Sequence, residues 1–181
     1  ARERLSKAGL ASMVELALRD YRDIDGQYDH IVSIEMLEAV GERYWQTYFR
    51  KLNGLLTPGG SAAIQTIVID DAHFEQYRSG TDFIQQYIFP GGMLPSPAKL
   101  EQLAEAHGFR IERCEFFGPD YAETLRRWRS KFEENLAQVQ AQGFDARFIR
   151  LWRLYLAYCE SGFDEGRIDV AQLQLVKERA L

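Results

Sequence analysis

Cysteine is scarce in this chain, and its scarcity bears on two classes of protein. Only Cys114 and Cys159 occur among the 181 residues, and they lie far apart without the spacing of metal ligands. The sequence therefore predicts neither a disulfide framework nor a metal site. We expect both side chains to be buried free thiols in a reducing compartment.

Long apolar runs and an excess of basic charge are missing as well. The longest apolar stretch, residues 62–69, is interrupted by Gln65 and Thr66 and is far too short to span a bilayer. The first residues are charged and helix-forming, unlike a signal peptide. A net charge of −5 argues against a nucleic-acid-binding protein, which carries a basic surface. The composition, 46% hydrophobic and 27% charged, predicts one ordered, soluble unit.

Basic residues nevertheless gather in the last third of the chain. Such a basic and aromatic surface can contact anionic lipid headgroups, although the whole chain is acidic. An ordinary helix pair with solvated polar faces explains the same pattern, and the sequence leaves both interpretations open. The cluster comprises Arg126, Arg127, Arg129, Lys131, Arg147, Arg150 and Arg153, with Phe148, Trp152 and Tyr155 between the last three.

Apolar periodicity predicts helices that alternate with strands. This alternation is typical of an α/β protein with a mostly parallel sheet covered by helices. Residues 70–97 are irregular, aromatic and apolar, and predict a short-helix insertion that covers a site. The expected helices are 2–9, one from Trp45 that ends at 57–60, one from Pro97 to Gly108 capped by Ser96, and two between 119 and 165. The expected strands are 13–18, 28–34, 61–69, 109–117 and 169–178.

Two carboxylates directly follow the strand expected at residues 28–34. Glu35 and Glu38 stand three apart in the block Ser33–Gly41, so they share a face if a helical turn begins there. Open α/β sheets bind ligands at the carboxyl ends of their strands, which makes Glu38 the leading catalytic candidate. The alternative is a first-turn glutamate that the helix dipole favours.

Three more blocks follow in order: Gln65-Thr66-Ile67, Asp82–Gly92 and Phe117–Tyr121. Together the four blocks resemble the C-terminal part of the cyclopropane-fatty-acyl-phospholipid synthases, which use S-adenosylmethionine. The resemblance implies a partial Rossmann-like class I methyltransferase sheet, strands 3 to 7, that ends in an antiparallel hairpin. Residues 1–181 would be the C-terminal part of one catalytic domain, with helical lipid-site insertions at 70–97 and 119–165.

The family's glycine-rich cofactor loop is not found among these residues, and no glycine here forms a substitute for it. Strand 13–18 would be the third strand of the fold, whose neighbours in the sheet come earlier in the family. We therefore expect it to lack a partner within this chain, and a homodimer is one way to supply one.

The resemblance also assigns an anion site. In the family, a glutamate at the position of Glu38 helps to bind a bicarbonate ion that removes a proton. Gln65 stands where many members carry a histidine, Ile67 offers a backbone group, and Tyr121 offers its hydroxyl. Glutamine does not carry protons near neutral pH, so Gln65 would orient the anion. The alternatives are a core amide bonded to backbone for Gln65 and a packed aromatic for Tyr121.

The resemblance places the S-adenosylmethionine cofactor along the same edge. Asp20 and Tyr21 would flank the adenine, while Ser33 and Glu35 would pass near the methionine portion. Apolar residues of the 70–97 insertion would line a channel for a long acyl chain, although plain core packing explains about half of them equally well. These channel residues are Phe83, Tyr87, Ile88, Phe89, Gly91 and Gly92.

The implied reaction transfers the sulfonium methyl group to a cis double bond of a phospholipid acyl chain and closes a cyclopropane ring. Three alternatives remain. The product could be a methyl-branched or methylene fatty acid, or the enzyme could methylate a carbon atom of a small molecule. The chain could also be a non-catalytic module that binds a lipid or a partner. We expect a cytoplasmic protein, peripheral at the inner membrane face. The isolated 181-residue chain is expected to be inactive because it lacks the cofactor loop.

Overall fold

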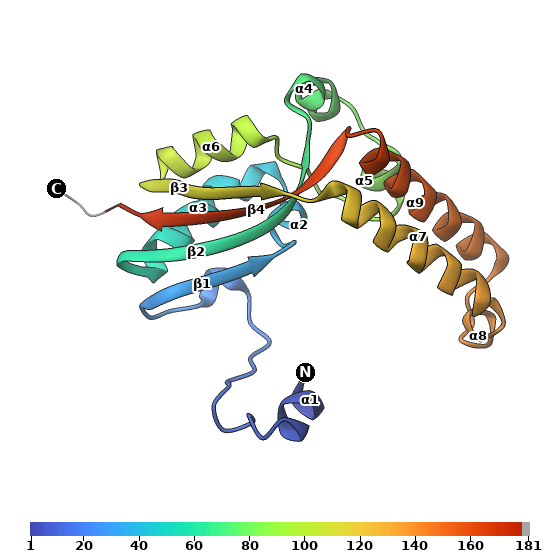
Figure 1. Cartoon of the computed structure of the whole chain (residues 1–181), viewed down its shortest axis with the longest axis horizontal. Coiled ribbons are helices and arrows are strands. Elements are labelled where there is room, and N and C mark those ends of the chain that lie inside the picture. The colour runs from blue at the N-terminus through green and yellow to red at the C-terminus, as the bar shows by residue number, and fades with distance from the viewer. Residues whose placement is uncertain (179–181) are drawn as a thin grey trace.

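The computed structural model describes residues 1–178 and places four strands in one mixed sheet (Figure 1). The strands are β1 (Tyr28–Ile34), β2 (Leu56–Ile69), β3 (Phe109–Phe116) and β4 (Ile168–Lys177). Their order is β1-β2-β4-β3, with β1 parallel to β2 and β4 antiparallel to both of its neighbours. The α/β class, the bounds of β1 and the closing antiparallel hairpin are as the sequence predicted.

Helices cover one face of this sheet and extend beyond its end. The helices α3 and α6 pack with the sheet, whereas α7 and α9 run side by side away from it to α8 at the tip (Figure 1). Within residues 1–178, no helix is both long and apolar enough to cross a membrane. The helices are α1 (Arg2–Lys7), α2 (Leu37–Val40), α3 (Trp45–Leu55), α4 (Asp71–Ser79), α5 (Phe83–Tyr87), α6 (Pro97–Ala106), α7 (Gly118–Glu134), α8 (Leu136–Ala141) and α9 (Ala146–Asp164), with short 3₁₀ turns η1 (Tyr21–Asp23) and η2 (Glu42–Tyr44).

The sequence explains why α3 and α6 form where they do. Trp45, Tyr48, Phe49 and Leu52 recur at helical spacing, and all four are buried against the sheet. At the start of α6, the Ser96 hydroxyl accepts a hydrogen bond from the Lys99 amide, as the cap prediction required. These helices and one sheet face form the main core, and a second cluster lies between α7, α9 and β4.

The outer edge of β1 is open, and so is the sheet face at Val32 and Ile34, whereas α7 and α9 cover that face at Val170 of β4. Val32 is 69% exposed and Ile34 57% exposed, and no strand among residues 1–178 pairs with the outer edge of β1. The predicted strand at 13–18 is wrong: the segment is a turn followed by chain without regular secondary structure, away from the sheet (Figure 1). As expected, this segment has no neighbouring strand among residues 1–178, and a strand forms only where a neighbour satisfies its backbone hydrogen bonds.

Two smaller predictions also fail. Residues 57–60 do not form a turn after α3, because β2 begins at Leu56, directly after the last residue of the helix. Cys114 on β3 is exposed, while Cys159 on α9 is partly buried. Both thiols are free.

Candidate active site

The carboxyl ends of β1 and β2 bring the predicted site residues together. Glu35 follows the last residue of β1, and its amide donates to the Gln65 carbonyl at 2.8 Å, so the strand pairing continues one residue beyond β1. Glu38 lies in the single turn of α2, and Tyr121 lies in the first turn of α7. Residues from four separate elements thus meet at one edge of the sheet, as the resemblance implied.

Glu35 occupies the centre of this group. Its Oε1 accepts hydrogen bonds from Gln65 Nε2 at 2.8 Å and from the Tyr121 hydroxyl at 2.9 Å. The same hydroxyl lies 3.1 Å from Glu35 Oε2. The sequence placed Glu35 with the cofactor; the structure places its carboxylate among the residues that the resemblance assigns to the anion.

Glu38 is bonded to the backbone of β2. Its Oε1 accepts a hydrogen bond from the Ile67 amide, while its Oε2 is buried without a partner among residues 1–178. Burial raises the pKa of the Glu38 carboxyl above its usual range, and the hydrogen bond from Ile67 opposes that shift. The Ile67 amide was the backbone group expected to face the anion.

Gln65 is held at both ends of its amide. Its Nε2 donates to Glu35, and its Oε1 accepts from Gln172 Nε2 at 2.9 Å. Gln172 stands directly opposite Gln65 in the β2–β4 register. The alternative of a core amide bonded to backbone is therefore wrong. Gln172 was not among the predicted site residues, although its alternation with Leu173 on the closing strand was the available signal.

Tyr121 is both a packed aromatic and a hydroxyl donor, the two roles that the sequence left open. Its ring packs 5.1 Å from the Phe163 ring and 6.3 Å from the Trp128 ring, centroid to centroid. Burial, followed by the hydrogen bond to Glu35, raises the pKa of its hydroxyl well above the usual range. Tyr121 therefore stays protonated near neutral pH and donates to the Glu35 carboxylate.

Three of the four expected cofactor residues, Asp20, Tyr21 and Ser33, form no hydrogen bond with the group around Glu35. Asp20 is bonded to the Arg22 guanidinium, which lowers the pKa of its carboxyl to about 2. The Tyr21 ring packs 5.9 Å from that of Tyr48. The Tyr48 hydroxyl and Ser33 Oγ are buried and lie close to each other, and neither has a further hydrogen-bond partner among residues 1–178. Unsatisfied buried polar atoms fit a site for a polar ligand such as S-adenosylmethionine.

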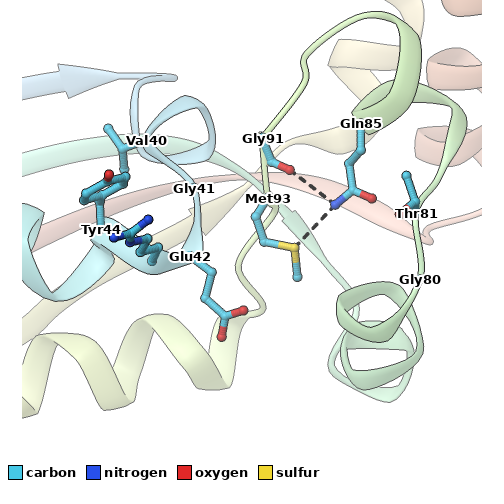
Figure 2. Close-up of a pocket in the computed structure, with 11 residues that line it drawn as sticks. Val40, Gly41, Glu42, Tyr44, Gly80, Thr81, Gln85, Gly91 and Met93 are labelled. Atoms are coloured by element: carbon cyan, nitrogen blue, oxygen red, sulfur yellow. Dashed lines mark hydrogen bonds between the residues drawn. The ribbon is translucent and has the colours of Figure 1, made fainter.

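A separate cavity of about 460 Å³ opens between α2–η2 and the loop that follows α5 (Figure 2). Of the six predicted channel residues, only Gly91 and Gly92 line it. Gln85 holds this loop by donating to the Gly92 carbonyl at 3.2 Å and contacting the Met93 sulfur at 3.5 Å (Figure 2). Met93 in turn donates its amide to the Glu38 carbonyl, so the cavity wall and the carboxylates share a backbone contact.

The aromatic channel residues contact α9 instead of the cavity. Phe83 packs against Tyr87 and Tyr158, and Phe89 packs against Tyr155. Tyr155 ends a row of rings that starts near the tip of the α7–α9 pair, with neighbouring centroids 4.3, 5.5 and 4.9 Å apart. The row consists of Phe144, Phe148, Trp152 and Tyr155; the sequence indicated the last three as one helix face but not as a path toward the site.

Three of the six arginines of the basic cluster join α7 to α9. Arg126 is bonded to Asp164, Arg129 to Glu160 and Arg153 to Glu133. Among residues 1–178, Arg147 and Arg150 form no ion pair and are exposed beside the row of rings. The helix-pair interpretation therefore holds for Arg126, Arg129 and Arg153. Contact with a lipid surface remains an interpretation for Arg147 and Arg150.

This fold and this edge of the sheet define the C-terminal part of a class I S-adenosylmethionine-dependent methyltransferase. The family model of mycolic acid cyclopropane synthetase matches residues 1–173, and the chain belongs to that family. It is 47% identical over 98% of its length to tuberculostearic acid methyltransferase UfaA1 of Mycobacterium tuberculosis. It is 34% identical over 88% of its length to cyclopropane-fatty-acyl-phospholipid synthase of Escherichia coli.

The structural comparison agrees. The crystal structure of mycolic acid cyclopropane synthase CmaA1 with SAH and CTAB matches 87% of this chain and 58% of that chain, with a TM-score of 0.79 and 30% identity. The chain spans only 42% of the length of the Mycobacterium tuberculosis relative and 40% of the Escherichia coli relative. The family and the methyltransferase class are thus established for this portion of a domain.

Proposed function

We propose that the protein containing this chain transfers a methyl group from S-adenosylmethionine to a cis double bond in an acyl chain of a phospholipid. The observation that carries the proposal is the pair of carboxylates, Glu35 and Glu38, held beside Tyr121 at the carboxyl ends of β1 and β2. Attack by a double bond leaves a carbocation on the acyl chain. Fixed negative charge in a poorly solvated site stabilises a cation far better than water does.

Each of these side chains has a distinct task in the proposal. When bound, S-adenosylmethionine supplies an electrophilic methyl group. Ser33 and Tyr48 offer the unsatisfied hydroxyls of its site. Glu38, bonded to the Ile67 amide, contributes charge stabilisation whenever it is ionised. Tyr121 and Gln65 fix the orientation of the Glu35 carboxylate.

Bicarbonate, the second group that the resemblance implies, does not fit the donors as they are arranged. The three donors expected for it are the Ile67 amide, Gln65 Nε2 and the Tyr121 hydroxyl. Each already donates to a carboxylate of this chain, either Glu38 or Glu35. A bound anion would have to displace these carboxylates, so we assign no step to bicarbonate.

The product depends on which proton the cation loses. Loss from the transferred methyl group closes a cyclopropane ring, the outcome favoured by the name of the Escherichia coli relative. If a hydride shift first moves the cation to the methylated carbon, loss of a methyl proton leaves a methylene group instead, and loss of a proton from the chain leaves a methyl-branched alkene. The 47% identical relative is named a tuberculostearic acid methyltransferase, and a 33% identical Pseudomonas putida protein is named a probable fatty acid methyltransferase. These relatives support the methyl-branched outcome as the second candidate.

The acyl chain would reach the site along α9. Rings from Phe144 to Tyr155 form a continuous apolar path, and each methylene buried there contributes about 0.8 kcal/mol. Exposed Arg147 and Arg150 near the start of that path suit anionic headgroups. Peripheral binding at the inner membrane face is therefore part of the proposal.

The test compares two proteins: the isolated 181-residue chain and the full product of the reading frame that contains it. S-adenosylhomocysteine is titrated into each by calorimetry, and each is incubated with S-adenosylmethionine and vesicles of monounsaturated phospholipid. We expect the full product to bind and to add one CH₂ unit to the acyl chain, and the isolated chain to do neither.

Proton NMR of the product distinguishes ring hydrogens from those of a methylene group. A full product that binds the cofactor but never modifies the lipid would refute the proposed substrate. Turnover by the isolated chain would refute its expected inactivity.

A further inference from the structure

The Glu35 carboxylate occupies the position that the family resemblance reserves for an external anion. Gln65 and Tyr121 are the two side-chain donors of that predicted site, and both point their hydrogens at Glu35. A carboxylate and bicarbonate present the same pair of oxygens to such donors. The chain therefore supplies its own anion, covalently attached one residue beyond β1.

The backbone at Glu35 supports a functional origin for this arrangement. Its φ is +50°, and among residues 1–178 it is the only residue other than glycine with a positive φ. The left-handed region is unfavourable for a glutamate by about 1–2 kcal/mol. Strain of this kind persists where the surroundings determine the conformation, and it clusters at active sites. Here the hydrogen bond from the Glu35 amide to the Gln65 carbonyl holds the backbone in place.

Glu35 also keeps capacity to accept a proton. Its Oε1 receives two hydrogen bonds, whereas its Oε2 is approached only by the Tyr121 hydroxyl at 3.1 Å, a donor that it shares with Oε1. Glu38 is less suited to this task, because the Ile67 amide donates to its Oε1 and its Oε2 is buried.

We propose that Glu35 replaces bicarbonate as the general base of this site and that the reaction proceeds without added bicarbonate. The inference rests on the proposed function. In the step concerned, a C–H bond of the carbocation breaks and the proton passes to a Glu35 carboxylate oxygen. The C–H electron pair closes the new carbon–carbon bond, either of the ring or of a double bond, and the cation is neutralised. Glu35 then returns the proton to solvent.

Two substitutions separate occupation of the site from proton transfer. Glu35→Gln keeps the shape and blocks the site but cannot take the proton. Glu35→Gly empties the site, frees the donors of Gln65 and Tyr121, and suits the positive φ, so the fold should persist. Circular dichroism and thermal melts of both variants confirm folding first.

Binding is measured without any turnover. ¹³C-labelled bicarbonate is titrated into the full product of the reading frame and followed by NMR line broadening. We expect saturable binding by Glu35→Gly and none by the wild type or by Glu35→Gln. Saturable binding by the wild type, or none by Glu35→Gly, would overturn the assignment of Glu35 to the anion position.

Turnover is then measured in carbon-dioxide-free buffer with and without bicarbonate. We expect the wild-type rate to be independent of bicarbonate, and Glu35→Gln to lose about 100-fold or more without rescue. Glu35→Gly should lose a similar factor and recover much of it when bicarbonate or formate is added. A wild-type rate that rises and saturates with bicarbonate, or an active Glu35→Gln variant, would refute the base role.

The binding and turnover experiments distinguish failure of the proposed function from failure of the Glu35 assignment. If the wild type makes no S-adenosylmethionine-dependent product, the proposed function fails and the base role fails with it. The bicarbonate titration still decides, in that event, whether Glu35 fills the anion position.

Discussion

The Ile67 backbone amide donates a hydrogen bond to the Glu38 side chain, which ties the turn of α2 to strand β2. The other oxygen of Glu38 is buried without a partner among residues 1–178. Ionised Glu38 is therefore only half satisfied, and burial raises its pKa above the usual value of about 4.5. Ionisation of this carboxylate therefore destabilises the fold.

Replacement of Glu38 by Gln should change how stability depends on pH. A raised folded-state pKa means that protonated Glu38 favours the fold at pH values below the unfolded pKa. This contribution is lost as pH rises through the folded pKa. We expect wild-type stability to fall relative to Glu38→Gln as pH rises from about 4.5. Urea unfolding at several pH values between 4 and 8 measures this difference, and parallel curves for the two proteins would contradict it.

Gly41 should tolerate substitution far less than Gly91, although both have a positive φ. A Cβ on Gly41 would lie 2.6 Å from the Gly91 carbonyl oxygen, whereas a Cβ on Gly91 would meet nothing within 4 Å. Gly41 also has ψ 158°, a conformation nearly confined to glycine. We expect Gly41→Ala to destabilise the fold by about 2–4 kcal/mol. Gly91→Ala should cost about 1–2 kcal/mol.

Thermal melts of the two alanine variants give the comparison. One kcal/mol corresponds to roughly 2–4 °C in a domain of this size, so the difference is measurable. Equal melting temperatures would show that the loop at Gly91 moves freely away from Gly41.

The sequence predicted elements wherever local signals sufficed. The turn at Asp25-Gly26 indicated the start of β1, and Ser96-Pro97 indicated the start of α6. The strand predicted at residues 13–18 was wrong, because a strand forms only beside a neighbouring strand and apolar character alone does not provide one. The predicted burial of Cys114 was also wrong, because residue type alone does not show which positions of a strand are covered.

The candidate site shows the same limit. Sequence order and resemblance brought Glu38, Gln65 and Tyr121 to one edge of the sheet. The partner of Gln65 and Tyr121 could not be predicted, because Glu35 reaches them only through a left-handed backbone at the end of β1. Spacing along the chain carries no information about such a dihedral angle.

Leu103 on α6 should contribute strongly to stability. Its side chain is 2% exposed within the main core, so Leu103→Ala leaves a cavity beside the sheet. We expect a loss of about 3 kcal/mol in the free energy of unfolding. Glu101→Ala on the exposed face of the same helix is the matched control and should change stability by less than about 0.5 kcal/mol. Similar losses for both would place α6 outside the core.

Arg147 and Arg150 should govern binding to anionic membranes. Both are exposed near the tip of the α7–α9 pair and form no ion pair among residues 1–178. Each basic residue near an anionic surface contributes about 1 kcal/mol, so the double Arg147→Ala, Arg150→Ala variant should bind about 30-fold more weakly. Flotation of the full product of the reading frame with phosphatidylglycerol vesicles measures this loss, and phosphatidylcholine vesicles should show none.

Arg153 offers the control on the same helix. Its guanidinium already donates to Glu133, so Arg153→Ala removes a charge that is largely neutralised. We expect its vesicle binding to stay close to that of the wild type, and all binding to weaken as salt screens the surface charge. If Arg153→Ala weakens binding as much as the double variant, net charge alone would explain the effect, and the tip of the helix pair would lose its assigned role.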